Sequence, residues 1–309
     1  MRRRSAFRNR FEYCLALAVL KSLEWTPLTL AHILARAYTR LLDLAIPRLR
    51  QVACRNLAFA LPGSAPSPVI DGVFRSIARL LVAFARFPSI RRDNLSRWIR
   101  LEGGEHYAGA IRQGRGVLFA TAHLGNWELS AYAHALLASP MNVVVRPLDN
   151  PLIDRLVERR RALSGNRLVL KKDFARAILK ALSANQAVGI LIDQNASPEN
   201  GVFVDFFGIP ACAATGLAKL AAHSGAAVIP GFALWSEAER RYILRFYPPL
   251  AISGDAARDT QLLQSKLEEV IRAYPDQWLW IHRRWKTRPA GHPPLYETAP
   301  RPSGSHPLL

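Results

Sequence analysis

The sequence predicts an α/β fold in which helices cover a central, largely parallel sheet, with membrane-associated helices at the N-terminus. Between residues 101 and about 250, short apolar stretches alternate with segments of helical pattern. This alternation is typical of parallel strands that are connected by helices. Half of the 309 residues are hydrophobic, so the chain can bury a substantial core and is not disordered. Its length fits one large domain or two smaller ones.

The N-terminal segment, residues 1–44, combines arginines with interrupted apolar runs. Five arginines lie within the first ten residues, and the apolar run Tyr13–Leu20 follows them. This order resembles a signal peptide, but no small-residue cleavage site follows. Lys21 and Glu24 interrupt the apolar run, so no stretch reaches the ~18 uncharged residues of a spanning helix. We predict one or two amphipathic helices over residues 11–44 that lie in a membrane interface, with the arginines near lipid phosphates. A cap on a soluble core and a single tilted anchor are the alternatives.

Residues 45–289 are predicted to form the α/β domain, which begins with a helical lead-in over residues 45–100. The stretch Leu61–Pro68, rich in proline and serine, is expected to break this lead-in as a loop. Strands are predicted at Val117–Ala122, Asn142–Val145, Leu168–Leu170, Val188–Ile192, Ala227–Phe232 and Tyr242–Phe246. Helices are predicted at Trp127–Leu137, Pro151–Ser164, Phe174–Ala184, Thr215–Ser224 and Asp259–Tyr274. Residues 290–309 are rich in Pro, Gly, Ser and His, and we expect a disordered tail there.

The charge and the cysteines limit the class of protein. The formal net charge is +19 and comes from arginine far more than lysine. Such a surface attracts phosphate-rich or acidic partners, which include nucleic acid, anionic lipid and acidic carrier proteins. Cys14, Cys54 and Cys212 are scattered and lack C-x-x-C spacing. This pattern argues against a disulfide framework and against a structural zinc site, and it favours a reducing compartment.

A base and a carboxylate lie five positions apart in the stretch His123-Leu124-Gly125-Asn126-Trp127-Glu128. The apolar run before it predicts a buried strand, and the pattern after it predicts a helix. Residues five apart on a regular helix point roughly 140° from one another, so the pair converges only if the motif bends, which Gly125 and Asn126 permit. A histidine held by a carboxylate is an oriented general base for a hydroxyl proton. The structural alternative is a core histidine with an unrelated surface glutamate.

Polar residues follow three of the predicted strands. His123 follows the first, Arg146 follows the second, and Asp193 with Gln194 follows another. In open α/β sheets, ligands bind outside the carboxyl ends of the strands. We therefore expect these side chains to share one site. The structural alternatives are a solvated loop arginine for Arg146 and a turn or cap for Asp193.

Several common sites are not found in the sequence. It contains no G-x-G-x-x-G after a strand, no P-loop, no G-x-S-x-G elbow and no H-E-x-x-H. Cys212 lies among alanines, where a small packing residue is expected. We therefore expect no metal and no cofactor. A histidine and carboxylate on a basic protein suit direct transfer of an already activated group onto a hydroxyl.

The stretch from His123 to Glu128 resembles the H-x-x-x-x-[DE] block of glycerolipid acyltransferases, in the form used by the late acyltransferases of lipid A biosynthesis. Further segments resemble the same narrower family in consistent order over roughly residues 10 to 290. They are Arg55-Asn56-Leu57 with Leu61-Pro62, Val145-Arg146-Pro147, Arg159-Arg160-Arg161, Ile192-Asp193-Gln194, Val204–Pro210 and Gln277–Pro289. The set in order is far more specific than the first block alone.

The resemblance implies a membrane-associated enzyme at the cytoplasmic face of the inner membrane. It would move an acyl chain from a thioester, usually on acyl carrier protein, to a hydroxyl of an anionic lipid A precursor. His123 would deprotonate this hydroxyl and Glu128 would orient the imidazole. The residues implied in substrate binding or in organising the site are Asn126, Arg146, Arg161, Asp193 and Gln194. For Arg161, dipole complementarity at a helix end is the structural alternative.

Three other functions stay open. Related enzymes acylate mannosylated phosphatidylinositol from acyl-CoA, and they share the same blocks. A thioester hydrolase would use a histidine-activated water in related chemistry. A basic protein that binds membrane or nucleic acid without catalysis is the alternative from another class. Because the arginines cluster at the termini and helix ends while the aromatics lie in apolar runs, we expect no nucleic-acid partner.

Overall fold

The computed structural model describes residues 5–170 and 174–296. The strands are β1 (Ile99–Glu102), β2 (Val117–Thr121), β3 (Asn142–Val145), β4 (Arg167–Leu170), β5 (Ala187–Leu191), β6 (Gly201–Phe206), β7 (Ile209–Ala214), β8 (Ala227–Ser236) and β9 (Arg241–Phe246). The helices are α1 (Ala6–Trp25), α2 (Leu28–Ala45), α3 (Pro47–Ala60), α4 (Pro66–Arg86), α5 (Gly104–Ile111), α6 (Trp127–Leu137), α7 (Pro151–Ala162), α8 (Phe174–Ser183), α9 (Gly216–Ser224) and α10 (Ala256–Ala273). Short 3₁₀ turns complete the described elements.

A seven-stranded sheet with the order β1-β9-β8-β2-β5-β3-β4 forms the centre of the fold. The neighbours from β8 to β4 are all parallel, whereas β9 pairs with β8 in antiparallel and with β1 in parallel. The prediction of an α/β fold with a largely parallel sheet is confirmed. This strand order brings the carboxyl ends of β2, β5 and β3 next to one another.

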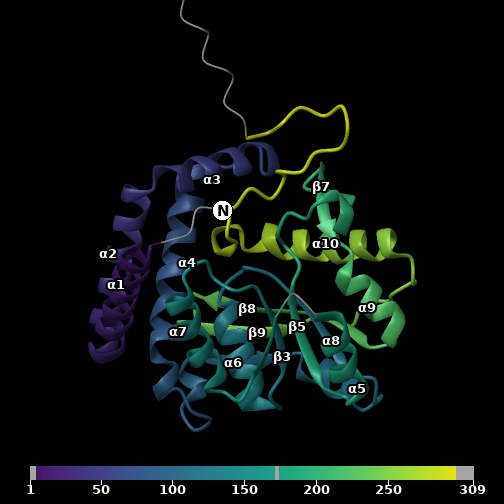
Figure 1. The fold of residues 1–309 in the computed structure, drawn as a ribbon, viewed down its shortest axis with the longest axis horizontal. Coiled ribbons are helices and arrows are strands. Elements are labelled where there is room, and N and C mark those ends of the chain that lie inside the picture. The colour runs from purple at the N-terminus through teal and green to yellow at the C-terminus, as the bar shows by residue number, and fades with distance from the viewer. Residues whose placement is uncertain (1–4, 171–173, 297–309) are drawn as a thin grey trace, which may run out of the picture.

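Helices cover both faces of the sheet (Figure 1). Side chains alternate along a strand, so Leu118 and Ala120 of β2 pack in the core beneath α8, α9 and α10. Val117 and Phe119 point to the opposite face and pack with α5 and α6. Every second residue of this strand therefore belongs to a different core, which accounts for its continuous apolar sequence.

The two N-terminal helices pack on one flank of the protein against α4, as Figure 1 shows on the left. Leu23 of α1 and Ala31 and Ala35 of α2 are fully buried in this packing. Among the described residues, no helix combines the length and the apolar character needed to cross a membrane. The helices are therefore part of the folded core, and their association with a membrane stays a prediction.

Some elements differ from the sequence prediction. The loop after α3 is shorter than predicted because α4 begins at Pro66, which suits the first turn of a helix. β1 begins within the last two residues of the predicted helical lead-in and continues beyond it, and neither this strand nor the β6–β7 hairpin was predicted. Its turn residues, Phe207 and Gly208, both have positive φ (61° and 74°), as a two-residue hairpin turn of type I′ requires. The hairpin buries Cys212 completely, which confirms its role in packing.

The predicted disordered tail begins later than expected. Tyr296 is 7% exposed, and its hydroxyl donates to Asn56 Oδ1 at 2.6 Å. The prediction for residues 290–309 is wrong at this position, because an aromatic ring with a buried polar partner is ordered by packing. The rest of the predicted tail, residues 297–309, lies outside the described residues, as do the arginines at positions 2–4.

Candidate active site

His123 is paired with a buried carboxylate at the carboxyl end of the sheet. It follows β2, and Asp193 follows the neighbouring strand β5. His123 Nδ1 lies 3.0 Å from Asp193 Oδ1, and the His123 backbone N–H donates to Asp193 Oδ2 at 3.1 Å. Because an ionised carboxylate only accepts hydrogen bonds, Nδ1 carries the imidazole hydrogen. This tautomer leaves Nε2 with a lone pair that can accept a proton.

His123 and Asp193 each shift the pKa of the other toward the charged form. Burial on its own would lower the pKa of His123, but the charge and the hydrogen bond of Asp193, assisted by the charge of Glu128, raise the pKa above its ordinary value. Burial would raise the pKa of Asp193, yet the neighbouring His123 holds that pKa far below its usual range. Asp193 is therefore an ion at every physiological pH, although it is fully buried.

Asp193 receives two further contacts from the segment after α10. Trp278 Nε1 donates to Asp193 Oδ2 at 3.0 Å, and His282 Nε2 lies 3.2 Å from the Asp193 backbone oxygen. The same segment holds the histidine, because the Leu279 N–H donates to the His123 backbone oxygen at 3.0 Å. The Trp278 hydrogen bond helps to satisfy a buried charge that would otherwise be costly. Together, these contacts also fix the position of the imidazole relative to the carboxylate.

Helix α3 supports this segment from behind. Asn56 is fully buried, and its Nδ2 donates to the backbone oxygens of Trp280 at 2.6 Å and of His282 at 2.8 Å. Tyr296 completes the arrangement by donating to the Asn56 oxygen. Asn56 and His282 were not among the predicted site residues. The available signal was that both lie in segments that resemble the family, Arg55-Asn56-Leu57 and Gln277–Pro289.

Glu128 pairs with Arg161 and not with His123. Arg161 Nε donates to Glu128 Oε2 at 2.9 Å, and Arg161 Nη2 donates to Glu128 Oε1 at 2.5 Å. This bidentate pair outweighs burial and raises the pKa of Arg161. The expectation that Glu128 orients the imidazole is therefore wrong, because the first turn of α6 directs Glu128 toward α7. The charge of Glu128 still favours the protonated imidazole, and the preceding residue, Trp127, packs its ring 4.9 Å from the His123 ring.

The bend between His123 and Glu128 has a clear backbone cause. Gly125 has a φ of +63°, and a Cβ at this position would collide with the Ala233 backbone oxygen of β8. The adjacent Asn126 N–H donates to that same oxygen at 2.9 Å. Glycine is required here because it tolerates positive φ and allows the two backbones to approach closely. The expected bend at Gly125 is confirmed.

The remaining predicted residues occupy different environments. Asn126 is fully buried, and its Oδ1 accepts from the Leu129 N–H at 2.9 Å as the N-cap of α6. This contact gives Asn126 a structural role at the start of the helix, and its predicted role in substrate binding stays a prediction. Arg146 follows β3, is exposed, and makes no hydrogen bond or ion pair with any described residue. Gln194 is exposed directly after Asp193. Substrate contacts by Arg146 and Gln194 stay predictions.

Two charged pairs therefore form the candidate site, and the strand ends predicted the first of them. His123 with Asp193 forms an oriented base, and Glu128 holds the Arg161 side chain, which is 24% exposed. Within residues 5–170 and 174–296, no three His, Cys, Asp or Glu side chains gather in a way that could hold a metal ion. The arrangement is suited to removing a proton from a hydroxyl beside a bound anion.

Comparisons with known proteins agree with this chemistry. The family profile described as bacterial lipid A biosynthesis acyltransferase matches residues 2–287. The chain is 33% identical over 205 residues to a lipid A biosynthesis lauroyltransferase of Escherichia coli, which covers 65% of this chain and 66% of the relative. It is 29% identical over 266 residues to a lipid A biosynthesis palmitoleoyltransferase of the same organism, which covers 84% and 86% of the two chains.

A third relative is named for a different acceptor. The chain is 30% identical over 241 residues to a phosphatidylinositol mannoside acyltransferase of Mycobacterium tuberculosis, which covers 75% of each chain. The relatives therefore share acyl transfer to a glycolipid and differ in the glycolipid.

Proposed function

The chain belongs to the bacterial lipid A biosynthesis acyltransferase family, and we propose that it transfers a fatty acyl group from an acyl thioester to a hydroxyl of a lipid A precursor. The observation that carries this proposal is the pairing of His123 with the buried Asp193 beside the Glu128–Arg161 ion pair. A base that is held in one tautomer and lies beside a partly exposed guanidinium suits an acceptor with both a hydroxyl and a negative charge.

The proposed reaction proceeds as follows. His123 Nε2 takes the proton of the acceptor hydroxyl while the acceptor oxygen attacks the thioester carbonyl carbon. The carbon–sulfur bond then breaks, and the departing thiolate receives the proton from the imidazolium. Asp193 stabilises the transient positive charge of His123 and keeps the ring oriented. The products are an ester and a free thiol, so atoms and charges balance.

Arg161 is the proposed contact for the negative charge of the acceptor. Its Nε and Nη2 are occupied by Glu128, while Nη1 makes no hydrogen bond with any described residue. Glu128 thus holds the guanidinium rigidly and leaves one edge for a phosphate oxygen. Arg146 and Gln194, exposed at the ends of the neighbouring strands, are the further candidates for substrate contacts.

Acyl carrier protein is the proposed acyl donor, because an acidic carrier complements a chain of net charge +19. The alternative is an acyl-CoA donor with a phosphatidylinositol mannoside or another glycolipid as acceptor, which the mycobacterial relative favours. Both alternatives use the same base. They differ in the donor and in the surface that recognises the acceptor.

We further propose that the protein works at the cytoplasmic face of the inner membrane. The outward sides of α1 and α2 expose large apolar side chains, including Phe7 (82% exposed), Phe11 (63%), Leu15 (59%) and Ile33 (59%). Large apolar side chains exposed on the outward sides of neighbouring helices are typical of a membrane or protein contact. The hydrogen bond from Asn150 Nδ2 to the Asn9 backbone oxygen, at 3.0 Å, connects α1 to the start of α7, near the carboxyl end of β3.

A reconstituted transfer assay tests the enzymatic proposal. Purified wild-type protein is given acyl carrier protein or CoA loaded with the same chain, together with a lipid A precursor or a phosphatidylinositol mannoside. We expect ester formation on the lipid A precursor with the carrier donor, and at least a ~10²-fold loss in His123→Ala. His223→Ala, at an exposed histidine on α9, is the matched control and should retain full activity. Free fatty acid without any ester would indicate a hydrolase, and near wild-type transfer by His123→Ala would refute the mechanism.

A liposome assay tests the membrane proposal. The double change Phe7→Gln and Leu15→Gln removes exposed apolar side chains from α1 and leaves its buried side intact. We expect most of this variant to leave anionic liposomes in sedimentation, whereas the control Leu163→Gln and Leu170→Gln, also at exposed leucines, should bind like the wild type. Equal binding of both variants would exclude α1 as the membrane contact.

A further inference from the structure

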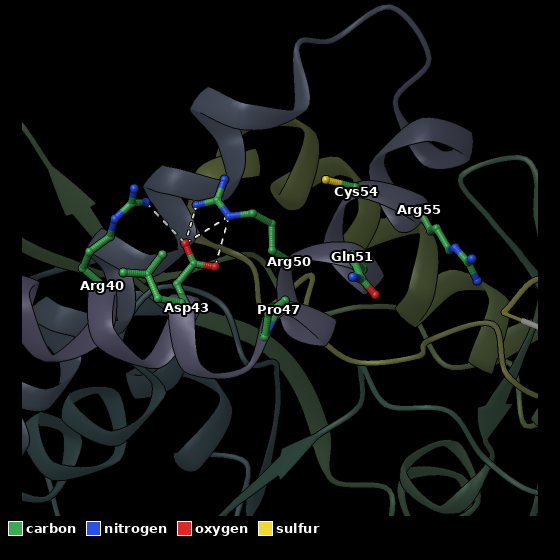
Figure 2. A pocket seen from close by; sticks show the side chains of 8 residues that line it. Arg40, Asp43, Pro47, Arg50, Gln51, Cys54 and Arg55 are labelled. Atoms are coloured by element: carbon green, nitrogen blue, oxygen red, sulfur yellow. Dashed lines mark hydrogen bonds and ion pairs between the residues drawn. The ribbon is translucent and has the colours of Figure 1, made fainter. Parts of the chain in front are cut away.

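A cavity of about 770 Å³ opens between the end of α2 and the first turns of α3 (Figure 2). Its lining combines three arginines, one aspartate, one glutamine, one cysteine and apolar side chains. Helix α2 contributes Arg40, Asp43 and Leu44, and α3 contributes Arg50, Cys54 and Arg55 among others. His123, Asp193, Glu128 and Arg161 do not line this cavity, so it is separate from the candidate active site.

The aspartate in this cavity is already neutralised. Asp43 is 6% exposed and accepts from Arg50 Nε at 3.0 Å and from Arg50 Nη2 at 2.7 Å. Arg40 Nη1 lies 3.5 Å from the same carboxylate, and Asp71 of α4 binds Arg50 Nη2 from the other side at 2.6 Å. The carboxylates therefore hold the Arg50 guanidinium in one orientation and present little free negative charge to the cavity.

Free guanidinium edges remain around the opening. Arg50 Nη1 makes no hydrogen bond with a described residue, and Arg40 has only the long contact to Asp43. Arg55 uses Nη1 to donate to the Tyr296 backbone oxygen at 3.0 Å and leaves its other nitrogens without a described partner. Figure 2 shows Arg40 and Arg50 converging from opposite helices over Asp43. Three guanidinium groups line the cavity against the carboxylates of Asp43 and the adjacent Asp71, so one positive charge remains in excess and favours an anion.

The surface beside the cavity is apolar. Leu41 is 61% exposed, Leu44 is 62% exposed, and Ile46, which connects α2 to α3, is 44% exposed. These side chains continue the exposed apolar surface of α2 up to the arginines. A ligand that fits both parts has a phosphate attached to a hydrocarbon chain. A free phosphate would gain nothing from the leucines, and the lining offers no aromatic ring on which a nucleic-acid base could stack.

We propose that the cavity between α2 and α3 binds the phosphate headgroup of an anionic glycerophospholipid, with the acyl chains along Leu41, Leu44 and Ile46. The guanidinium groups bind the phosphate oxygens, and the fixed orientation of Arg50 lowers the entropy lost on binding. This site is independent of the acyl acceptor of the proposed reaction. It gives the N-terminal helices a specific lipid contact in addition to a general apolar one.

The thiol of Cys54 provides a direct probe, because it lines the cavity and is partly exposed. Cys212 is buried, and Cys14→Ser removes the exposed thiol of α1. The alkylation rate of Cys54 is measured with dihexanoyl phosphatidylglycerol, with dihexanoyl phosphatidylcholine, or with inorganic phosphate. All three probes are soluble monomers at the concentrations used. We expect phosphatidylglycerol to slow alkylation about fivefold or more, and the other two probes to leave it nearly unchanged.

Charge variants provide the second arm of the experiment. Arg40→Gln with Arg55→Gln removes two exposed guanidinium groups and leaves the Asp43–Arg50 pair intact. This variant should need about tenfold more phosphatidylglycerol for the same protection, whereas the control Arg258→Gln, at an exposed arginine of α10, should behave like the wild type. Equal protection by phosphatidylcholine, protection by inorganic phosphate, or no protection by phosphatidylglycerol would each overturn the proposal. The measurement does not use acyl transfer, so it stands apart from the proposed reaction.

Discussion

Replacing Asp193 with asparagine tests which carboxylate orients the base. Asp193 Oδ2 accepts two hydrogen bonds, from the His123 backbone N–H and from Trp278 Nε1. In Asp193→Asn the amide oxygen is expected to keep these two donors, which turns the amide NH₂ toward His123 Nδ1. The imidazole must then accept at Nδ1 and carry its hydrogen on Nε2. In this tautomer Nε2 has no lone pair for the proton of the acceptor hydroxyl.

The size of the effect follows from this inversion. Loss of the correct tautomer in a histidine–carboxylate pair typically lowers kcat by about 10³- to 10⁴-fold, which corresponds to roughly 4 to 5 kcal/mol in the activation barrier. The residual activity should also change its pH dependence. Burial alone lowers the pKa of His123, and Asp193 is the main group that raises it. The acid limb of log kcat/KM reports the raised pKa of His123 in the wild type, so it should move to lower pH in this variant.

The matched control is Glu128→Gln, which removes the carboxylate predicted from the sequence motif. Its hydrogen bonds go to Arg161, so we expect a smaller loss of kcat, a raised KM for the acceptor and only a slight shift of the acid limb. The assay is the pH profile of initial rates for both variants, with circular dichroism to verify folding. Two results would refute the assignment of Asp193. One is a folded Asp193→Asn enzyme with near wild-type kcat, and the other is a loss of kcat of about 10³-fold or more in Glu128→Gln alone.

Three further predictions concern the same fold. Arg161→Lys should raise the acceptor KM about tenfold or more, because lysine keeps the charge but cannot form the bidentate pair with Glu128. Thermal stability should stay nearly unchanged. An unchanged KM would contradict the phosphate contact. Gly125→Ala should lower the melting temperature by several degrees or prevent folding, because of positive φ and the collision with Ala233; unchanged melting would show that the backbone relaxes there. His134 packs 4.9 Å from the Tyr107 ring and 5.2 Å from the Phe119 ring, and burial lowers its pKa from 6.5 to about 4. The unfolded chain therefore binds the proton first, so stability that is complete above pH 6.5 should fall by about 3 kcal/mol as the pH drops to 4. Denaturant titrations of wild type and His134→Leu at pH 7 and pH 4.5 measure this, and an equal loss in both proteins would exclude His134 as its source.

The sequence predicted the parts of the fold that depend on local pattern. All six predicted strands exist, and α6 has the predicted bounds because Asn126 caps it and its apolar pattern is regular. The β6–β7 hairpin was missed because its turn, Phe207-Gly208, lacks the usual Asn-Gly signal and because Pro210 argues against a strand. A local pattern also gave no reason to expect Tyr296 to be ordered, since its partner Asn56 lies 240 residues earlier.

The location of the candidate site was predicted correctly, but the carboxylate that pairs with His123 was not. The strand-end rule correctly brought His123 and Asp193 together. It could not decide between Asp193 and Glu128 as the partner of His123, because that choice depends on the direction in which the first turn of α6 points. Glu128 is five positions from His123 in sequence, and Asp193 is 70 positions away, yet the adjacency of β2 and β5 makes the distant residue the contact. Proximity along the chain was therefore a misleading guide to chemistry.

The contact of Trp278 with Asp193 has a consequence for the time at which the protein becomes active. A chain that emerges from a ribosome presents His123 first, and the 155 residues between positions 123 and 278 then take roughly 8 to 30 seconds to synthesise at 5–20 residues per second. Until the segment of Trp278 and His282 arrives, Asp193 lacks its indole donor and the His123 loop lacks its backbone partner Leu279. The proposed base is therefore complete only when almost the whole α/β domain has been synthesised, although His123 itself emerges much earlier.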